Sequence, residues 1–186
     1  MTRLLMVAAL GFAAPAWAGD KADALKQLTQ LEYDTAHEIH RTVKMGIVHR
    51  EYQVGEACLV AHKTAKTSIT TGRELKEAGK DRAAYRALRE GLRALRPCVD
   101  EFSQEKAPKG LKNAVRATMR RADEHLVLLH NFIKDTKNPK ATKSYEQAKV
   151  LRDEMKKKNA AGDLKGAVHA WFQMLRAFDQ AVLDQK

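Results

Sequence analysis

The sequence predicts an all-α protein: an antiparallel bundle of four to six helices built from helical hairpins. Alanine, leucine, lysine, arginine and glutamate dominate the chain, and proline occurs only 4 times in 186 residues. No segment alternates apolar and polar residues as a half-buried strand does. Beyond the first 20 residues, apolar positions recur every three or four residues almost throughout, which is the spacing of one helix face. Antiparallel helical hairpins of this kind pack into bundles.

The first 18 residues have the organisation of a secretory signal peptide. A positively charged start precedes an apolar run over 4–14, and an Ala-Trp-Ala sequence ends the segment. The run is too short to span a bilayer. No cysteine follows the cleavage site and no Arg-Arg pair precedes the run, which favours the general secretory route. We therefore expect residues 1–18 to be removed as a signal peptide. Residues 19–186 should then form a single helical-bundle domain in the periplasm or outside the cell.

Stripes of apolar residues mark the expected helices in order, over 25–43, 54–72, 88–102, 111–133, 145–155 and 164–182. Gly79 and Gly162 stand where helices would end, and Asp81 and Asp163 stand where the following helices would be capped. Two turn sequences, Ala-Pro-Lys-Gly and Asn-Pro, separate the later helices. Pro97 predicts either a kink or a fresh helix start.

A weak internal repeat accompanies these stripes. Segment 77–95 aligns without a gap on segment 160–178 and shares seven identical residues with it. Alanine-rich helices also match by chance, so duplication and coincidence both stay open as explanations.

The two cysteines predict a disulfide, because exported chains oxidise their thiols. If Gly79 lies in the turn of a hairpin, Cys58 and Cys98 lie at nearly the same height on its two arms. A disulfide between them would close a loop of about 40 residues and stabilise the fold by about 3–4 kcal/mol. The alternative, a soft metal site of Cys58 with His62, requires reduced thiols and is disfavoured.

The segment HEIHRTVKMGIVH, residues 37–49, is the candidate metal site. Its possible ligands are His37, His40, Met45 and His49. Histidine and methionine suit copper, and imidazoles also suit zinc. At about 100° per residue these side chains spread over roughly half of a straight helix, so they converge only if Gly46 bends it or a neighbour contributes. Surface or core-edge histidines are the favoured interpretation, and copper or zinc binding is the alternative.

A row of arginines is the candidate anion-binding site. Its members recur at spacings of four, three, four and three: Arg82, Arg86, Arg89, Arg93 and Arg96. Like charges one helical turn apart repel by a few tenths of a kcal/mol per pair, so the row is either a well-solvated face or a face that meets an anionic partner.

The overall charge favours anionic partners. The chain has 34 Lys and Arg against 23 Asp and Glu, a formal net charge of +11. An acidic protein, a lipid headgroup or a polyanion would each suit that balance. Aromatic residues are not interleaved with the arginines, and helix-turn-helix and zinc-finger patterns are missing, so nucleic acid is not indicated.

No motif in the sequence indicates an enzyme. Gly-x-Ser-x-Gly, Walker-type and Gly-x-Gly-x-x-Gly sequences are all missing. Glu32 is the one acidic residue within an apolar stripe, and His125 flanks another stripe in a position typical of a structural residue. The sequence therefore predicts an exported, non-catalytic helical protein that binds an anionic partner through its arginine row. Transition-metal binding is the alternative function.

Overall fold

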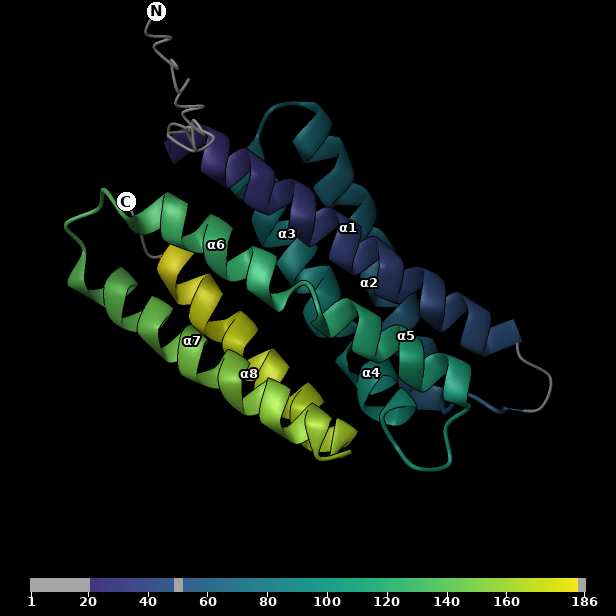
Figure 1. The fold of residues 1–186 in the computed structure, drawn as a ribbon. Helices are drawn as coiled ribbons and strands as arrows, with labels where there is room; N and C mark the ends of the chain where they lie inside the picture. Colours follow the sequence, from purple (N-terminus) through teal and green to yellow (C-terminus); the bar gives the residue numbers. More distant parts are fainter. Residues whose placement is uncertain (1–20, 49–51, 184–186) are drawn as a thin grey trace, which may run out of the picture.

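The computed structural model describes residues 21–48 and 52–183, and this part of the chain is helical without a strand. The helices are α1 (Lys21–Val48), α2 (Glu56–Glu77), α3 (Asp81–Ala94), α4 (Arg96–Phe102), α5 (Lys109–Met119), α6 (Ala122–Ile133), α7 (Pro139–Ala160) and α8 (Leu164–Leu183) (Figure 1). The predicted all-α class is confirmed. The expected signal peptide lies outside the described residues, and the internal duplication stays a prediction.

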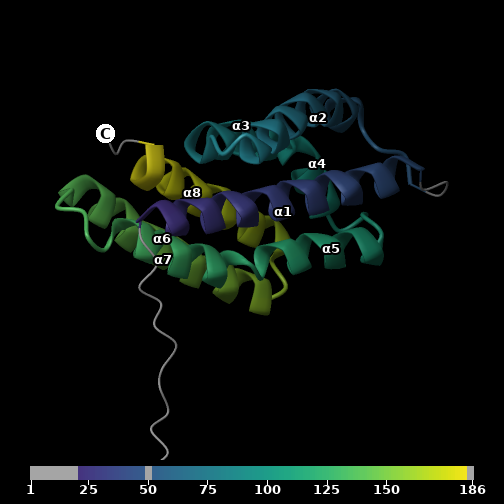
Figure 2. The ribbon, with the colours of Figure 1, turned by 90° about the horizontal axis from the view of Figure 1, so that it is seen from above.

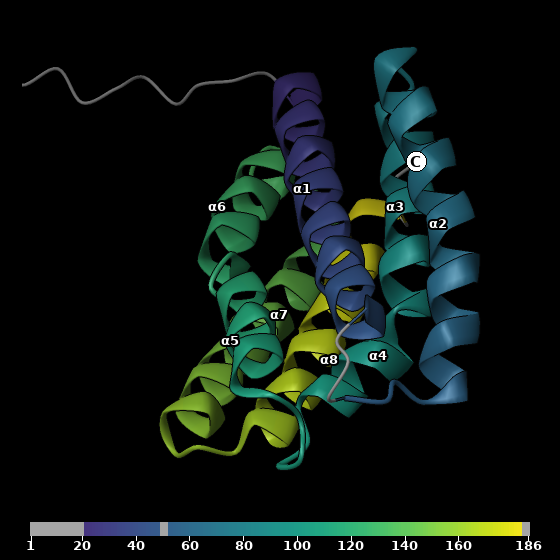
Figure 3. The same ribbon diagram turned by 90° about the vertical axis from the view of Figure 1, so that its right-hand side faces the viewer.

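The helices form three layers. Figure 2 shows α1 and α8 between a layer that contains α2 and α3 and a layer that contains α5, α6 and α7. Helix α2 packs along α3, and α7 packs along α8. Helix α1 contacts α2, α3, α5 and α6, so it joins the two outer layers (Figure 3). This arrangement brings α1, α3, α6 and α8 together in the interior.

The turns follow the predicted glycine positions. Gly79 has φ +70° and Gly162 has φ +82°, in the left-handed region that glycine adopts without strain. The Asp163 carboxylate accepts a hydrogen bond from the Gly166 N–H at 2.8 Å, as expected of a capping residue. Asp81 differs from expectation because it is the first residue of α3 and makes no capping hydrogen bond there.

Two helix boundaries refine the predicted stripes. The stripe over 111–133 is divided between α5 and α6 at Arg120 and Arg121. There the Arg120 N–H donates to two carbonyl oxygens, those of Arg116 and Ala117, and the Arg121 N–H donates to the carbonyl oxygen three residues earlier. These bonds tighten the turn, while the backbone dihedrals of both residues stay close to helical values. Pro97 lies in the first turn of α4, where its missing N–H costs nothing.

Close packing of α2 on α3 depends on two glycines. A Cβ atom on Gly72 would lie 2.6 Å from Leu88 Cγ, and one on Gly91 would lie 2.8 Å from Ile69 Cγ1. Both distances are shorter than carbon atoms tolerate, so any larger residue would push the helices apart. The glycines therefore fix the position of α3 and of the side chains that α3 carries into the interior.

A disulfide joins Cys58 on α2 to Cys98 on α4. The sulfur atoms lie 2.04 Å apart, and neither residue is accessible to solvent. Cys98 belongs to the short helix that begins at Arg96, so the bond fixes α4 against α2 just beyond the end of α3. Such a pair is compatible with an exported protein. None of the described helices has the length and apolar character needed to cross a membrane.

Candidate functional site: a buried ion-pair network beside an arginine pocket

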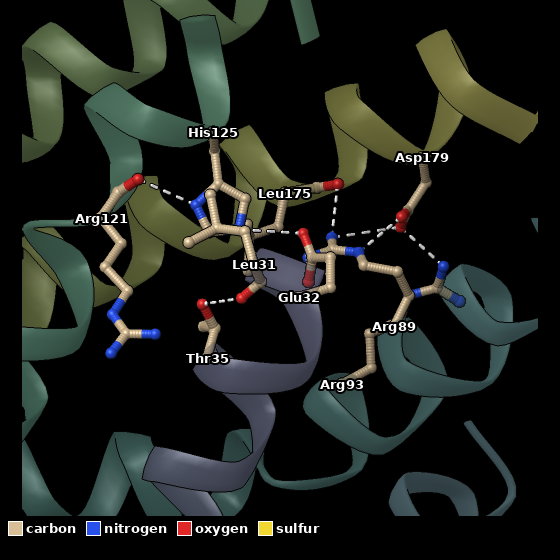
Figure 4. Close-up of polar contacts among 9 residues, drawn as sticks. All are labelled: Leu31, Glu32, Thr35, Arg89, Arg93, Arg121, His125, Leu175 and Asp179. Atoms are coloured by element: carbon tan, nitrogen blue, oxygen red, sulfur yellow. Dashed lines mark hydrogen bonds and ion pairs between the residues drawn. The ribbon is translucent and has the colours of Figure 1, made fainter. Parts of the chain in front are cut away.

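Glu32 is the centre of a polar network in the interior. Its side chain is inaccessible to solvent where α1 meets α3, α6 and α8 (Figure 4). Arg89 Nη1 lies 3.3 Å from Oε2, and His125 Nε2 lies 3.1 Å from Oε1. Burial raises the pKa of the Glu32 carboxyl, but Arg89 and His125 together outweigh burial and leave the pKa below its ordinary value. The carboxylate is therefore held in its charged form.

Arg89 links three helices through one guanidinium group. It is 1% exposed on α3. Its Nε donates to Asp179 Oδ1 at 2.7 Å, and its Nη2 donates to the Leu175 carbonyl oxygen at 2.5 Å, both on α8. Burial lowers the pKa of Arg89, but the carboxylates of Glu32 and Asp179 raise it by more. The pKa of Arg89 therefore lies above its ordinary value. The N–H groups of the Arg89 guanidinium therefore all have hydrogen-bond acceptors within the chain.

His125 closes the network on the α6 side. Its Nδ1 lies 2.9 Å from the Arg121 carbonyl oxygen, while its Nε2 faces the Glu32 carboxylate. Both ring nitrogens therefore face oxygen atoms within the chain. The interpretation of His125 as a structural residue agrees with this position.

The buried position of Arg89 corrects its assignment to an exposed face formed by the arginine row. Taking Arg82 as zero at about 100° per residue, Arg89 lies near 340° and Arg86 near 40°, so about 60° separates them around the helix. Glu32 of α1 and Asp179 of α8 lie against Arg89, which is buried, whereas Arg86 is exposed. The sequence spacing alone did not show on which side α8 would lie.

The other members of the row have separate surroundings. Arg82 Nη2 donates to the Leu183 carbonyl oxygen at 2.8 Å, at the end of α8. Arg93 Nη2 lies 2.6 Å from Asp179 Oδ2, an oxygen that also accepts a longer hydrogen bond of 3.4 Å from Arg89 Nη2. Arg96 pairs with Asp100 at 3.3 Å, and its guanidinium lies 5.3 Å from the centre of the Phe172 ring. The five arginines of the row therefore do not form one uniform exposed face.

A small cavity lies against the edge of this network, between the α3–α4 segment and α8. Its volume is about 110 Å³, and it is lined by Arg89, Leu92, Arg93, Arg96, Phe172, Leu175 and Arg176. The lining residues include four arginines and no aspartate or glutamate. Asp179 and Asp100 pair with lining arginines, whereas Arg176 is exposed and forms no ion pair within the described chain. Sequence reasoning missed Phe172, Arg176 and Asp179, because α8 shows them only as neighbours of a long apolar stripe.

The predicted metal ligands are not gathered together by the described part of the structure. The His37 ring stacks on Tyr33, with centroids 5.7 Å apart, and Met45 is 48% exposed. His40 stacks instead on His62 of α2, with centroids 4.3 Å apart and planes 8° from parallel. His49 lies outside the described residues. Within residues 21–48 and 52–183, no three His, Cys, Asp or Glu side chains form a group that could hold a metal ion, and copper or zinc binding stays a prediction.

The stacked histidines make stability depend on pH. Burial, His62, His37 and two lysines lower the pKa of His40 to about 4, and burial with the lysines also lowers the pKa of His62. Below pH 6.5 the unfolded chain therefore binds more protons than the folded protein, so stability falls as the pH drops from about 6.5 towards 4. After allowance for solvent screening, we expect a loss of about 1 kcal/mol between pH 7.5 and 5.

Urea unfolding at these two pH values measures that loss. A His40→Asn, His62→Asn variant should show a smaller difference between the two pH values than the parent, because asparagine does not titrate. An equal pH dependence in variant and parent would show that the pair does not contribute.

Comparison with known proteins gives no relative from which a function could be transferred. The chain matches no known family model, no curated protein and no solved structure. Its function must therefore be argued from the chemistry of its own side chains.

Proposed function

We propose that the protein is an exported, non-catalytic binding protein that holds a small anionic group in the arginine pocket between α3 and α8. The observation that carries this proposal is the lining itself: four arginines surround one small cavity, and no carboxylate lines it. A cavity of about 110 Å³ has room for a few waters or one phosphate- or carboxylate-sized group, since a water occupies about 30 Å³ of the liquid.

Arginine suits such a ligand better than lysine does. The planar guanidinium can donate two parallel hydrogen bonds to a carboxylate or a phosphate. Arg176 has no carboxylate partner within the described chain, and Arg96 is one-third exposed on its side chain, so both can turn towards a ligand. Phe172, under the Arg96 guanidinium, provides an apolar wall that limits water on one side of the cavity.

The buried network gives the pocket a rigid inner wall. Arg89 is held by Glu32, Asp179 and the Leu175 carbonyl, so its charge stays in place without a ligand. Arg93 is held in turn by Asp179. A ligand would therefore meet Arg93 and the two adjustable arginines, Arg96 and Arg176, in front of a fixed Arg89, and little ordering of the inner pair would be required on binding.

Calorimetric titration with inorganic phosphate at low salt tests the proposal. The parent protein should bind phosphate, and added sodium chloride should weaken binding because it screens the exposed charges. An Arg96→Gln, Arg176→Gln variant should bind at least about tenfold more weakly, because hydrogen bonds to charged groups contribute about 1.5–3 kcal/mol each.

Arg86→Gln is the control, since Arg86 is exposed on α3 but does not line the cavity. It should bind phosphate as the parent does. Equal affinities in all three proteins, with unchanged helicity, would refute the proposal.

A further inference from the structure

One end of the molecule concentrates exposed apolar side chains. Among the described residues, seven large apolar side chains are exposed, and five of them lie at the end of α1 and the start of α2: Met45, Ile47, Val48, Leu59 and Val60. Val48 is the most exposed of these, at 70%. Exposed apolar residues scattered singly need no explanation, but such a concentration marks an interaction surface.

The two helices bring these residues to one end of the molecule. The end of α1 and the start of α2 lie at the same end of the molecule (Figures 1 and 2). The stacked rings of His40 and His62 bring the helices into contact on this side. Ile47 lies about two turns beyond His40, and Leu59 lies one turn before His62 along antiparallel helices, so both extend the same surface towards the tip.

Most of the charges around this apolar tip are positive. Lys44, Lys63 and Lys66 are exposed, and none forms an ion pair within the described chain. Glu56 is the only acidic residue in the described segments 41–48 and 52–66. Basic and aliphatic side chains therefore lie together at this end of the molecule, beside two carboxylates: Glu56, and Glu101 of α4, which accepts hydrogen bonds from Tyr52 and Gly55.

We propose that this tip docks on an anionic phospholipid surface. Aliphatic residues that enter the headgroup region, with lysines that meet the lipid phosphates, are the features of a protein attached to a membrane without crossing it. A protein partner fits less well, because the centres of protein interfaces are enriched in aromatic residues and depleted of lysine. The exposed apolar residues of the tip include no aromatic side chain. The proposal uses none of the pocket residues and stands independently of anion binding there.

Co-sedimentation of the full exported chain with vesicles tests this proposal. The protein should bind vesicles that mix phosphatidylglycerol with phosphatidylcholine and should not bind phosphatidylcholine alone. Binding should weaken with rising salt, since the surface potential of the lipid acts only within a Debye length of about 8–10 Å at physiological salt.

The chain provides a matched pair of variants. Val48→Gln with Val60→Gln removes two exposed aliphatic side chains from the tip, while Val127→Gln with Val150→Gln removes two of similar exposure from α6 and α7. The tip variant should partition about tenfold more weakly, because the transfer of two partly buried valines is lost. The α6–α7 variant should bind as the parent does. A Lys44→Gln, Lys63→Gln, Lys66→Gln variant should lose most binding and most of the salt dependence.

Several results would overturn the proposal. Equal partitioning of the two valine variants would show that the tip does not enter the membrane. Failure of the parent to bind mixed vesicles would exclude lipid docking altogether. If the tip variant instead abolished self-association of the parent, measured by analytical ultracentrifugation, a second copy would be the occupant. The Arg96→Gln, Arg176→Gln variant should still bind vesicles, which separates this test from that of the pocket.

Discussion

Replacing Arg89 with methionine is expected to lower the free energy of unfolding by about 3–5 kcal/mol. Methionine fills much of the same volume but leaves the Glu32 carboxylate, which is inaccessible to solvent, without its arginine partner. It also leaves the Leu175 carbonyl oxygen without its donor and Asp179 with Arg93 alone. An uncompensated buried charge costs more than the original pair contributed, which is why the loss should be large.

Urea unfolding followed by circular dichroism measures this loss, with Arg86→Met as the control. Arg86 is exposed on the same helix, and its replacement should change stability by no more than about 0.5 kcal/mol. Adding Glu32→Gln to Arg89→Met should restore part of the lost stability, because the buried charge is then removed. Two results would show that the residues do not act as a pair. One is a loss of under 1 kcal/mol in Arg89→Met, and the other is a further loss in the double variant equal to that of Glu32→Gln alone.

The helical fold was predictable from local patterns, and the boundaries depended on backbone details. Glycine at positions 79 and 162 and proline at position 97 each indicated a stop or a start that the structure contains. The division between α5 and α6 was not predictable, because Arg120 and Arg121 leave the apolar stripe in register across a turn with nearly helical dihedrals. A pattern of period 3.6 cannot detect a break that preserves its phase.

The site was only half visible in the sequence. Glu32 stood out because a carboxylate within an apolar stripe must find a partner. The partner, Arg89, was hidden in a row of five similar arginines, and what selects it is the side on which α8 packs. Asp179 and Arg176 both lie on α8. Asp179 pairs with arginines of α3, whereas Arg176 lines the pocket. Contacts between helices distant in sequence decide such roles, and a single sequence does not encode them in a readable local form.

Reducing the Cys58–Cys98 disulfide is expected to lower the free energy of unfolding by about 3–4 kcal/mol. The bond separates residues 40 positions apart. Its loss gives the unfolded chain the conformational freedom of a loop of that length, which accounts for an effect of this size. The helices should stay folded, because both residues lie within the hydrophobic core, and the expected change is a looser position of α4 against α2.

A Cys58→Ala, Cys98→Ala variant distinguishes this effect from that of the reductant. The variant should unfold at the same lowered urea concentration with or without dithiothreitol, while the parent should shift only when dithiothreitol is present. Parent protein isolated without reductant should contain no titratable thiol, and two free thiols would contradict the expected bond. Because the bond fixes α4 immediately after Arg96, the variant should also bind phosphate more weakly than the parent if the α3–α8 pocket is the anion site. Unchanged phosphate binding in a destabilised variant would instead show that the bond stabilises the fold without shaping the pocket.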